Sequence, residues 1–84
     1  MAKHDRTVAT LRKRPIPSNI RWDDVVSLLK SLGFELVKGS GSRRKFFNKD
    51  KNVLIICHEP HPQSYIDKGC ASDIHEKLKE NELI

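Results

Sequence analysis

The chain has 84 residues, a net charge of +5 at pH 7 and 37% hydrophobic residues. Its length allows one domain with a small core, because a chain of this size buries only about 60–65% of its unfolded surface on folding. No apolar run approaches the roughly 18 residues of a membrane span, and the charged N-terminus lacks the apolar core of a secretory signal. We therefore expect a cytoplasmic protein of bacterial type without a cofactor.

Positive charge is concentrated in two segments. Residues 1–14 hold five Lys and Arg residues against one Asp, and residues 38–51 hold six against one. Residues 69–84 are acidic instead, with four Asp and Glu residues against two Lys. This polarity predicts a polyanionic partner for the basic side, RNA or DNA first, although many charged segments are simply solvated.

Residues 1–19 are predicted to form a basic N-terminal arm in front of one domain, residues 20–84. Apolar residues three apart indicate a short helix over residues 5–14, with Asp5 as its N-cap. Pro15 ends this helix, because proline forces the preceding residue out of helical geometry, and an extended connector follows. A disordered arm explains the same segment equally well.

The strongest helix pattern spans residues 23–32. Its apolar residues recur at i, i+3, i+4 and i+7, so they share one face. These residues are Val25, Leu28, Leu29 and Leu32. Gly33 supplies a left-handed C-terminal turn. Trp22, at the start of the helix, is expected to close the core rather than to bind a ligand.

Three strand patterns follow, over residues 34–38, 44–48 and 52–57, and short polar turns separate them. Consecutive strands joined by short turns predict an antiparallel meander. A final helix over residues 70–80 carries apolar residues at i, i+3 and i+7. The predicted fold class is α+β: a helix-strand-strand-strand-helix domain of two layers, with an extra short N-terminal helix.

Two aromatic residues lie side by side in the second strand. Phe46 and Phe47 alternate faces, so one of them packs in the core. The other could stack on a nucleotide base, but we favour its partial burial against the N-terminal arm.

The two cysteines give little indication of function. Cys57 lies in an apolar run and Cys70 at the start of the last helix, without Cys-x-x-Cys spacing. We expect two buried, inert thiols. A zinc site formed by both cysteines with His58 and His61 is the alternative, but the spacing is not a standard one and two prolines stiffen the intervening chain. We expect no metal.

Residues 38–47 are the stretch most indicative of function. Small, flexible residues allow a tight turn, and three consecutive cations and two aromatic residues follow. A hairpin entering a basic strand would hold these cations on a scaffold. The candidate RNA-binding residues are Lys38, Arg43, Arg44 and Lys45.

The order of these elements resembles the HicA family of toxins from bacterial toxin–antitoxin pairs. The matching features are residues 28–34, Gly41-Ser42, Phe46, His61-Pro62 and a late helix with Ile74 and Leu78, over about residues 20–80. The resemblance implies a fold similar to the double-stranded-RNA-binding domain. It also implies metal-independent cleavage of messenger RNA and a protein partner, an antitoxin of the HicB family.

One position departs from the pattern of that family. A histidine usually follows Gly-Ser within two positions and is the catalytic residue, whereas this chain has Arg43 and Arg44 there. The N-terminal extension, Ile20-Arg21-Trp22 and Asp67-Lys68-Gly69 resemble a HicA subgroup that also carries arginine after Gly-Ser.

Cleaving RNA without a metal requires a base for the 2′-hydroxyl, an acid for the departing oxygen and cations for the charge on the phosphate. Histidine suits the proton transfers, because its ordinary pKa lies near neutrality, whereas arginine only grips the phosphate. We therefore expect catalysis by His61, or else His58, together with Arg44. The alternative for His61 is a structural role between its flanking prolines.

Three functions fit the sequence: a HicA-type ribonuclease toxin, a non-catalytic RNA-binding module of the same shape, and an interaction protein whose basic face binds an acidic antitoxin. We favour the toxin. An acidic HicB-like reading frame beside the gene would support the first and third functions over the second.

Overall fold

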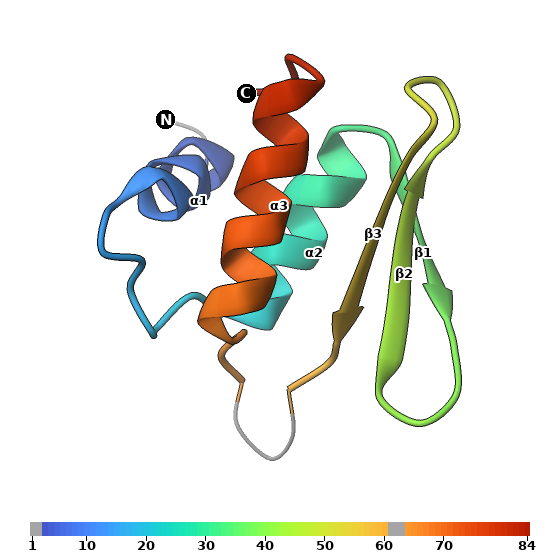
Figure 1. Cartoon of the computed structure of the whole chain (residues 1–84), viewed down its shortest axis with the longest axis horizontal. Helices are drawn as coiled ribbons and strands as arrows, with labels where there is room; N and C mark the ends of the chain where they lie inside the picture. The colour runs from blue at the N-terminus through green and yellow to red at the C-terminus, as the bar shows by residue number, and fades with distance from the viewer. Residues whose placement is uncertain (1–2, 61–63) are drawn as a thin grey trace.

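The computed structural model describes residues 3–60 and 64–84 as a small sheet packed against helices (Figure 1). The elements of this described part are α1 (Lys3–Arg12), α2 (Trp22–Ser31), β1 (Phe34–Lys38), β2 (Arg43–Asn48), β3 (Val53–His58) and α3 (Lys68–Glu80). The predicted α+β order is confirmed. No helix in this part of the chain is long and apolar enough to cross a membrane.

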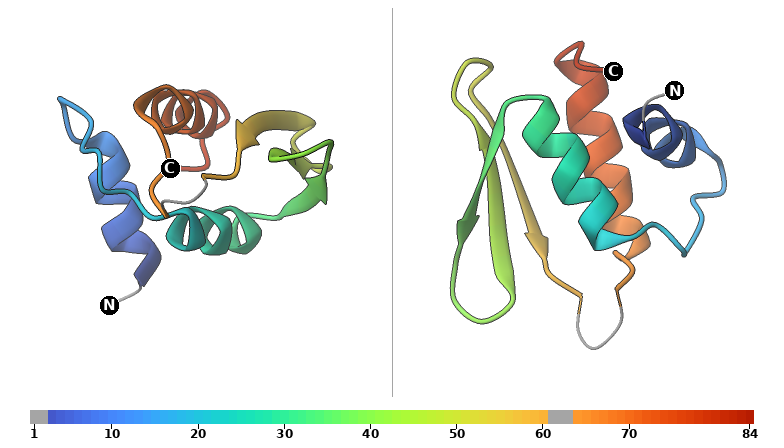
Figure 2. Two further views of the ribbon diagram at one scale, coloured as in Figure 1. Left: turned by 90° about the horizontal axis from the view of Figure 1, so that it is seen from below. Right: turned by 180° about the vertical axis from the view of Figure 1, so that it is seen from behind.

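The strands form an antiparallel sheet in the order β1-β2-β3, as predicted. Both α2 and α3 lie on one face of this sheet, and α1 packs on those two helices on the side away from the sheet (Figures 1 and 2). The other face of the sheet is not covered by any described helix. We call it the open face.

One hydrophobic core fills the space between the sheet and the helices. The largest fully buried side chains are Leu11, Val25, Leu28, Leu29, Phe46, Ile55, Ile74 and Leu78. Phe46 is central, because it pairs with Leu36 and Ile55 across the sheet and lies 5.5 Å from the Trp22 ring, centroid to centroid. The predicted role of Trp22 in closing the core is confirmed.

Phe47 lies on the open face instead, because successive side chains of a strand point to opposite faces. It is half-buried. The prediction that the N-terminal arm covers this second aromatic residue is wrong, because α1 packs on the far side of α2 and α3 (Figure 2).

Of the two predicted states of the N-terminal segment, the helix is the one observed. Leu11 of α1 is fully buried in the common core. Asp5 lies in the first turn and is not the N-cap, because α1 begins at Lys3. Its carboxylate still lies near the helix N-terminus, where the helix dipole favours negative charge.

A buried asparagine links α2 to the turn between β2 and β3. Asn48 Nδ2 donates to the Leu32 carbonyl (3.0 Å), and Asn48 Oδ1 accepts from the Lys51 N–H (3.0 Å). Gly33 follows directly with φ +96°, the left-handed turn predicted for it. These contacts fix where the helix ends and the sheet begins.

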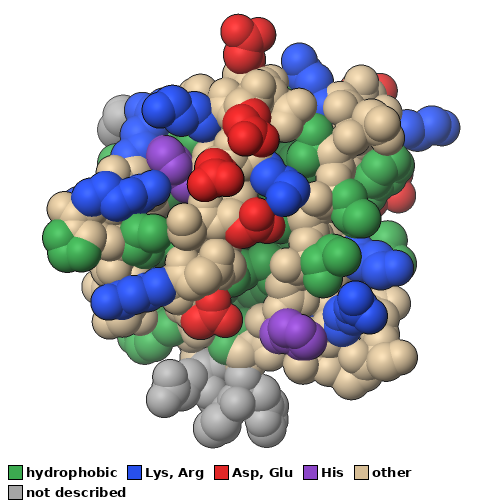
Figure 3. Space-filling view, viewed as in Figure 1, with side chains coloured by type: hydrophobic (Ala, Val, Ile, Leu, Met, Phe, Trp, Pro, Cys, Tyr) green, Lys and Arg blue, Asp and Glu red, His purple; other side chains and the backbone are tan. Residues whose placement is uncertain are grey.

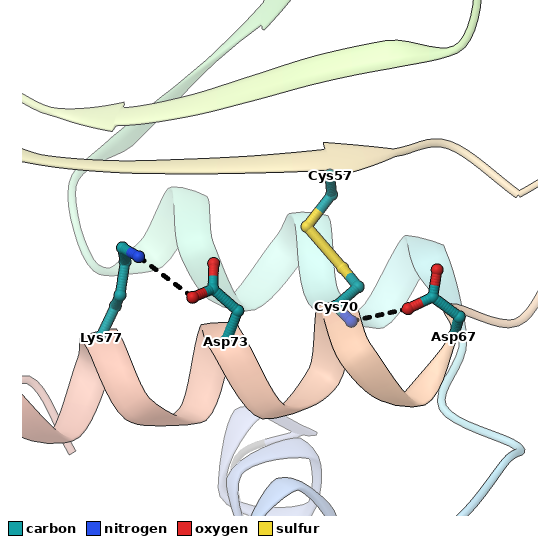
Figure 4. Close-up of a disulfide and its surroundings, with 5 residues drawn as sticks. All are labelled: Cys57, Asp67, Cys70, Asp73 and Lys77. Carbon is teal, nitrogen blue, oxygen red and sulfur yellow. Dashed lines mark hydrogen bonds and ion pairs between the residues drawn. A yellow bond between two sulfur atoms is a disulfide. The ribbon is translucent and has the colours of Figure 1, made fainter.

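The last helix begins at Lys68, two residues before its predicted start. The side chain of Asp67 caps it, since Oδ1 accepts from the Cys70 N–H at 2.6 Å (Figure 4). The segment before the cap is held by the chain that enters α2: the Trp22 N–H donates to the Ser64 carbonyl and the Ile66 N–H to the Ile20 carbonyl.

Cys57 and Cys70 are joined in a disulfide between the end of β3 and the first turn of α3 (Figure 4). Their Cα atoms lie 5.9 Å apart, a usual separation for such a bond. The prediction of two free, inert thiols is therefore wrong. The zinc alternative needed the same two sulfur atoms as ligands, and here they are bonded to each other.

Removing this disulfide should destabilise the fold. We expect Cys70→Ser to lower the free energy of unfolding by about 3 kcal/mol, because the bond closes a loop between residues 13 apart in the unfolded chain. Denaturant unfolding with and without a thiol reductant measures the effect. The reductant should not change the variant further. Alkylation of both thiols in denatured, unreduced protein would show that the bond is not formed.

Candidate nucleic-acid interface

The predicted functional stretch lies where the turn between β1 and β2 meets the end of β3. Gly41 adopts φ +58° in this turn, a left-handed conformation that suits glycine. The Gly39 N–H donates to the Arg43 carbonyl (2.8 Å), and the Glu59 N–H donates to the Ser42 carbonyl (2.8 Å). Backbone hydrogen bonds therefore hold the turn and the exit of β3 together.

The four predicted RNA-binding cations do not form one cluster. Since strand side chains alternate, Arg43 and Lys45 project from the open face, and Arg44 projects toward the helix side with Phe46. Lys38, the register partner of Arg44, shares that side at the end of β1. All but Arg44 are exposed. The sheet thus divides the basic stretch between two faces.

Arg44, predicted as both catalytic and RNA-binding, is tied to its own surroundings. Its Nε lies 3.0 Å from Glu59 Oε1, and its Nη1 donates to the carbonyl groups of Gly41 (2.9 Å) and Arg43 (2.8 Å). Only 14% of the side chain is exposed. These contacts tie the turn to the exit of β3.

A hollow of about 230 Å³ opens beside this ion pair, lined by Gly41, Ser42, Arg44, Glu59 and Pro60. Its lining combines one cation, one carboxylate and one hydroxyl.

His58 completes the open-face end of the site. It lies directly opposite Arg43 in the register of β2 and β3, and its Nδ1 is 3.3 Å from Ser42 Oγ. When Nδ1–H donates to the Ser42 hydroxyl oxygen, Nε2 is unprotonated and its lone pair is free to accept a proton. Both side chains are exposed. An imidazole, a hydroxyl and a guanidinium are thereby brought together: a group that moves protons beside one that binds phosphate.

His61, the first choice for proton transfer, lies outside the described residues, so only His58, the second choice, has a position. Sequence reasoning missed Ser42 and Glu59 as partners in the site. The length of the β2–β3 turn could have indicated them. Because the strands are antiparallel, pairing of Asn48 with Val53 also pairs Arg43 with His58, five residues away from the turn on each strand, and this brings the two flanking residues close together.

Another group of basic side chains lies where the end of α1 meets α3. His75 Nδ1 is 3.1 Å from an Arg14 guanidinium nitrogen. Burial lowers the pKa of His75, and the nearby charges of Arg14, Lys79 and Arg12 lower it further. The ring is therefore neutral at pH 7 and accepts from Arg14. The His75 side chain is half-buried.

The acidic side chains gather elsewhere. Figure 3 shows Asp and Glu side chains over α3, with Lys and Arg on both flanks. This agrees with the charge polarity read from the sequence. The open face and the α1 side carry the positive charge.

The chain is thus a small α+β domain whose three strands lie between α2 and α3 in sequence and carry a basic turn between β1 and β2. A family model described as HicA toxin of bacterial toxin-antitoxin matches residues 22–83. The chain belongs to this HicA toxin family. No curated protein and no solved structure matches it.

Proposed function

We propose that this chain is the toxin of a toxin–antitoxin pair and that it binds and cleaves messenger RNA without a metal ion. Membership of the HicA family supports the first part. The observation that carries the second is the juxtaposition of His58 with Arg43 and Ser42 on the open face. Its partners are RNA and a HicB-like antitoxin.

In the proposed reaction, His58 takes the proton of the ribose 2′-hydroxyl. The 2′-oxygen then attacks the adjacent phosphorus, and the bond from phosphorus to the 5′-oxygen breaks. The departing oxygen takes its proton from water, and His58 afterwards releases its own proton to solvent. The products are a 2′,3′-cyclic phosphate and a free 5′-hydroxyl. Arg43 stabilises the charge that builds on the phosphate oxygens, which arginine can grip through two parallel hydrogen bonds. No metal is needed for these steps.

The other predicted residues take supporting roles. Arg44 holds the turn through Glu59, so its effect on catalysis is indirect. Lys45 extends the positive charge of the open face, and Lys38 adds charge on the opposite side. His61 stays a second candidate for proton transfer, on sequence grounds.

Affinity for RNA tests the phosphate contact. We expect Arg43→Ala to weaken binding of a 2′-O-methyl oligonucleotide, which lacks the nucleophile and so cannot be cleaved. The slope of log K against log salt should fall by about 0.7, the value for one lost contact to a single-stranded phosphate. Adding Arg44→Ala should change the slope little, because Glu59 already neutralises that guanidinium.

Lys30→Ala, an exposed cation on α2, is the matched control and should leave the slope unchanged. An Arg43→Ala variant that keeps both the affinity and the salt slope of the original chain would remove Arg43 from the interface. Cleavage of a long messenger RNA in the presence of a chelator tests the enzymatic part. Failure of the original chain to cleave would contradict it.

A further inference from the structure

The open face carries an exposed apolar array that the proposed chemistry does not use. Val37, Leu54 and Ile56 are 49%, 43% and 42% exposed. They are three of the four large apolar side chains exposed in the described part of the chain, and Tyr65 is the fourth. Figures 1 and 2 show that no described helix lies over this face.

The register makes the array contiguous. One row across the sheet consists of Glu35, Phe47 and Leu54, and the next consists of Val37, Lys45 and Ile56. Neighbouring residues in a row lie on strands about 4.8 Å apart, so their side chains touch or nearly touch. We call Val37, Lys45, Phe47, Leu54 and Ile56 the open-face array. It is a patch of four apolar side chains around one ammonium group.

The apolar side chains of the open-face array indicate a binding surface because they are contiguous. Single apolar residues are common on protein surfaces, but a clustered patch rimmed by charge marks an interaction site. A three-stranded sheet with both helices on one side leaves this patch in water. A partner that buries it would gain hydrophobic free energy in proportion to the apolar area covered.

The charges of the face select the partner. Lys45 lies at the centre, Arg43 and His58 lie in the following row, and Glu35 lies at the β1 edge. A second copy of this chain would bring cation against cation, which is unfavourable. An RNA strand would pair with the cations, but the three exposed apolar side chains are aliphatic and the one aromatic ring, Phe47, is half-buried, so the face offers bases little to stack on.

We propose that the open-face array docks an acidic protein, the antitoxin of the pair, which covers Leu54 and Ile56 with apolar side chains and places a carboxylate on Lys45. This inference rests on the proposed function for the identity of the partner. The array itself is defined by the sheet.

The test uses the full chain and the HicB-type antitoxin encoded with it as the probe. Leu54→Thr combined with Ile56→Thr removes apolar contact area and keeps two residues that favour strands. We expect the Kd for the antitoxin to rise roughly 100-fold or more, as for central interface residues. Lys45→Glu should also weaken antitoxin binding, by charge repulsion. This single variant tests the inference even if the double variant does not fold.

Matched controls lie outside the array. Tyr65→Thr removes the remaining exposed apolar side chain, and Lys30→Glu reverses an exposed charge on α2. Both should leave the antitoxin affinity unchanged. Binding of the 2′-O-methyl oligonucleotide by the threonine double variant should also be unchanged, with the native circular dichroism spectrum retained.

Three results would overturn the inference. The first is full antitoxin affinity in the folded double variant or in Lys45→Glu. Loss of oligonucleotide binding with antitoxin binding intact would assign the face to RNA. A dimeric original chain that the double variant converts to a monomer would assign it to a second copy.

The same experiments distinguish failure of this inference from failure of the proposed function. If the original chain does not cleave RNA but the double variant no longer binds the antitoxin, the docking face is supported and the nuclease proposal is contradicted. If the original chain does not bind the antitoxin at all, the inference and the proposed pairing both fall.

Discussion

Replacing His58 with Ala should reduce cleavage of messenger RNA by roughly 100- to 10,000-fold, the contribution of a positioned acid or base. The fold should be unaffected, because the side chain is exposed at the end of β3. Cleavage rates of the original and variant chains, measured with excess protein and a chelator, give the effect. Ser42→Ala should cause a smaller loss, since the hydroxyl only orients the ring through Nδ1.

His61→Ala is the matched comparison, because it removes a second imidazole three residues further along the chain. If His61→Ala abolishes cleavage and His58→Ala does not, proton transfer belongs to His61. If the original chain binds the oligonucleotide but never cleaves RNA, the domain is a binding module. Cleavage that survives loss of both histidines would contradict the proposed mechanism.

Replacing Phe46 with Ala should lower the free energy of unfolding by about 3–5 kcal/mol, the usual result of emptying a fully buried aromatic site. Phe46 has no exposed surface and packs on Trp22. Small domains are stable by only about 5–15 kcal/mol in total, so the variant should be partly unfolded at physiological temperature. Denaturant unfolding followed by circular dichroism measures the loss.

Phe47→Ala is the control for this result. It removes the same side chain from the next position of β2, where the ring is half-buried on the open face. The loss of stability should be clearly smaller. Equal losses for the two variants would contradict the assignment of Phe46 to the core and Phe47 to the open face.

The helices and strands with periodic apolar residues could be predicted from the sequence, because the apolar residues of each element mark the face that it buries. The strand over residues 34–38 was predicted with its observed bounds, and β2 and β3 each lie within one residue of their predictions. The start of α3 was missed because the capping hydrogen bond of Asp67 lies outside the apolar repeat. A local side-chain contact thus extended the helix beyond its pattern.

The features that depend on docking could not be predicted in the same way. The Cys57–Cys70 bond requires α3 to lie against the end of β3, and nothing in the spacing of the two cysteines shows that. The pairing of His58 with Arg43 depends on the register of two strands. Treating the four cations as one set ignored the alternation of faces, which separates Arg44 from Arg43 and Lys45.

The order of the sheet bears on how the chain folds. Each strand pairs only with the strand that comes next to it in sequence, so every pairing closes a short loop. Short loops cost little entropy to close, and folds built from such local contacts form quickly. Residues 22–58 include α2 and the complete sheet. We expect this unit to assemble before α3 docks against β3.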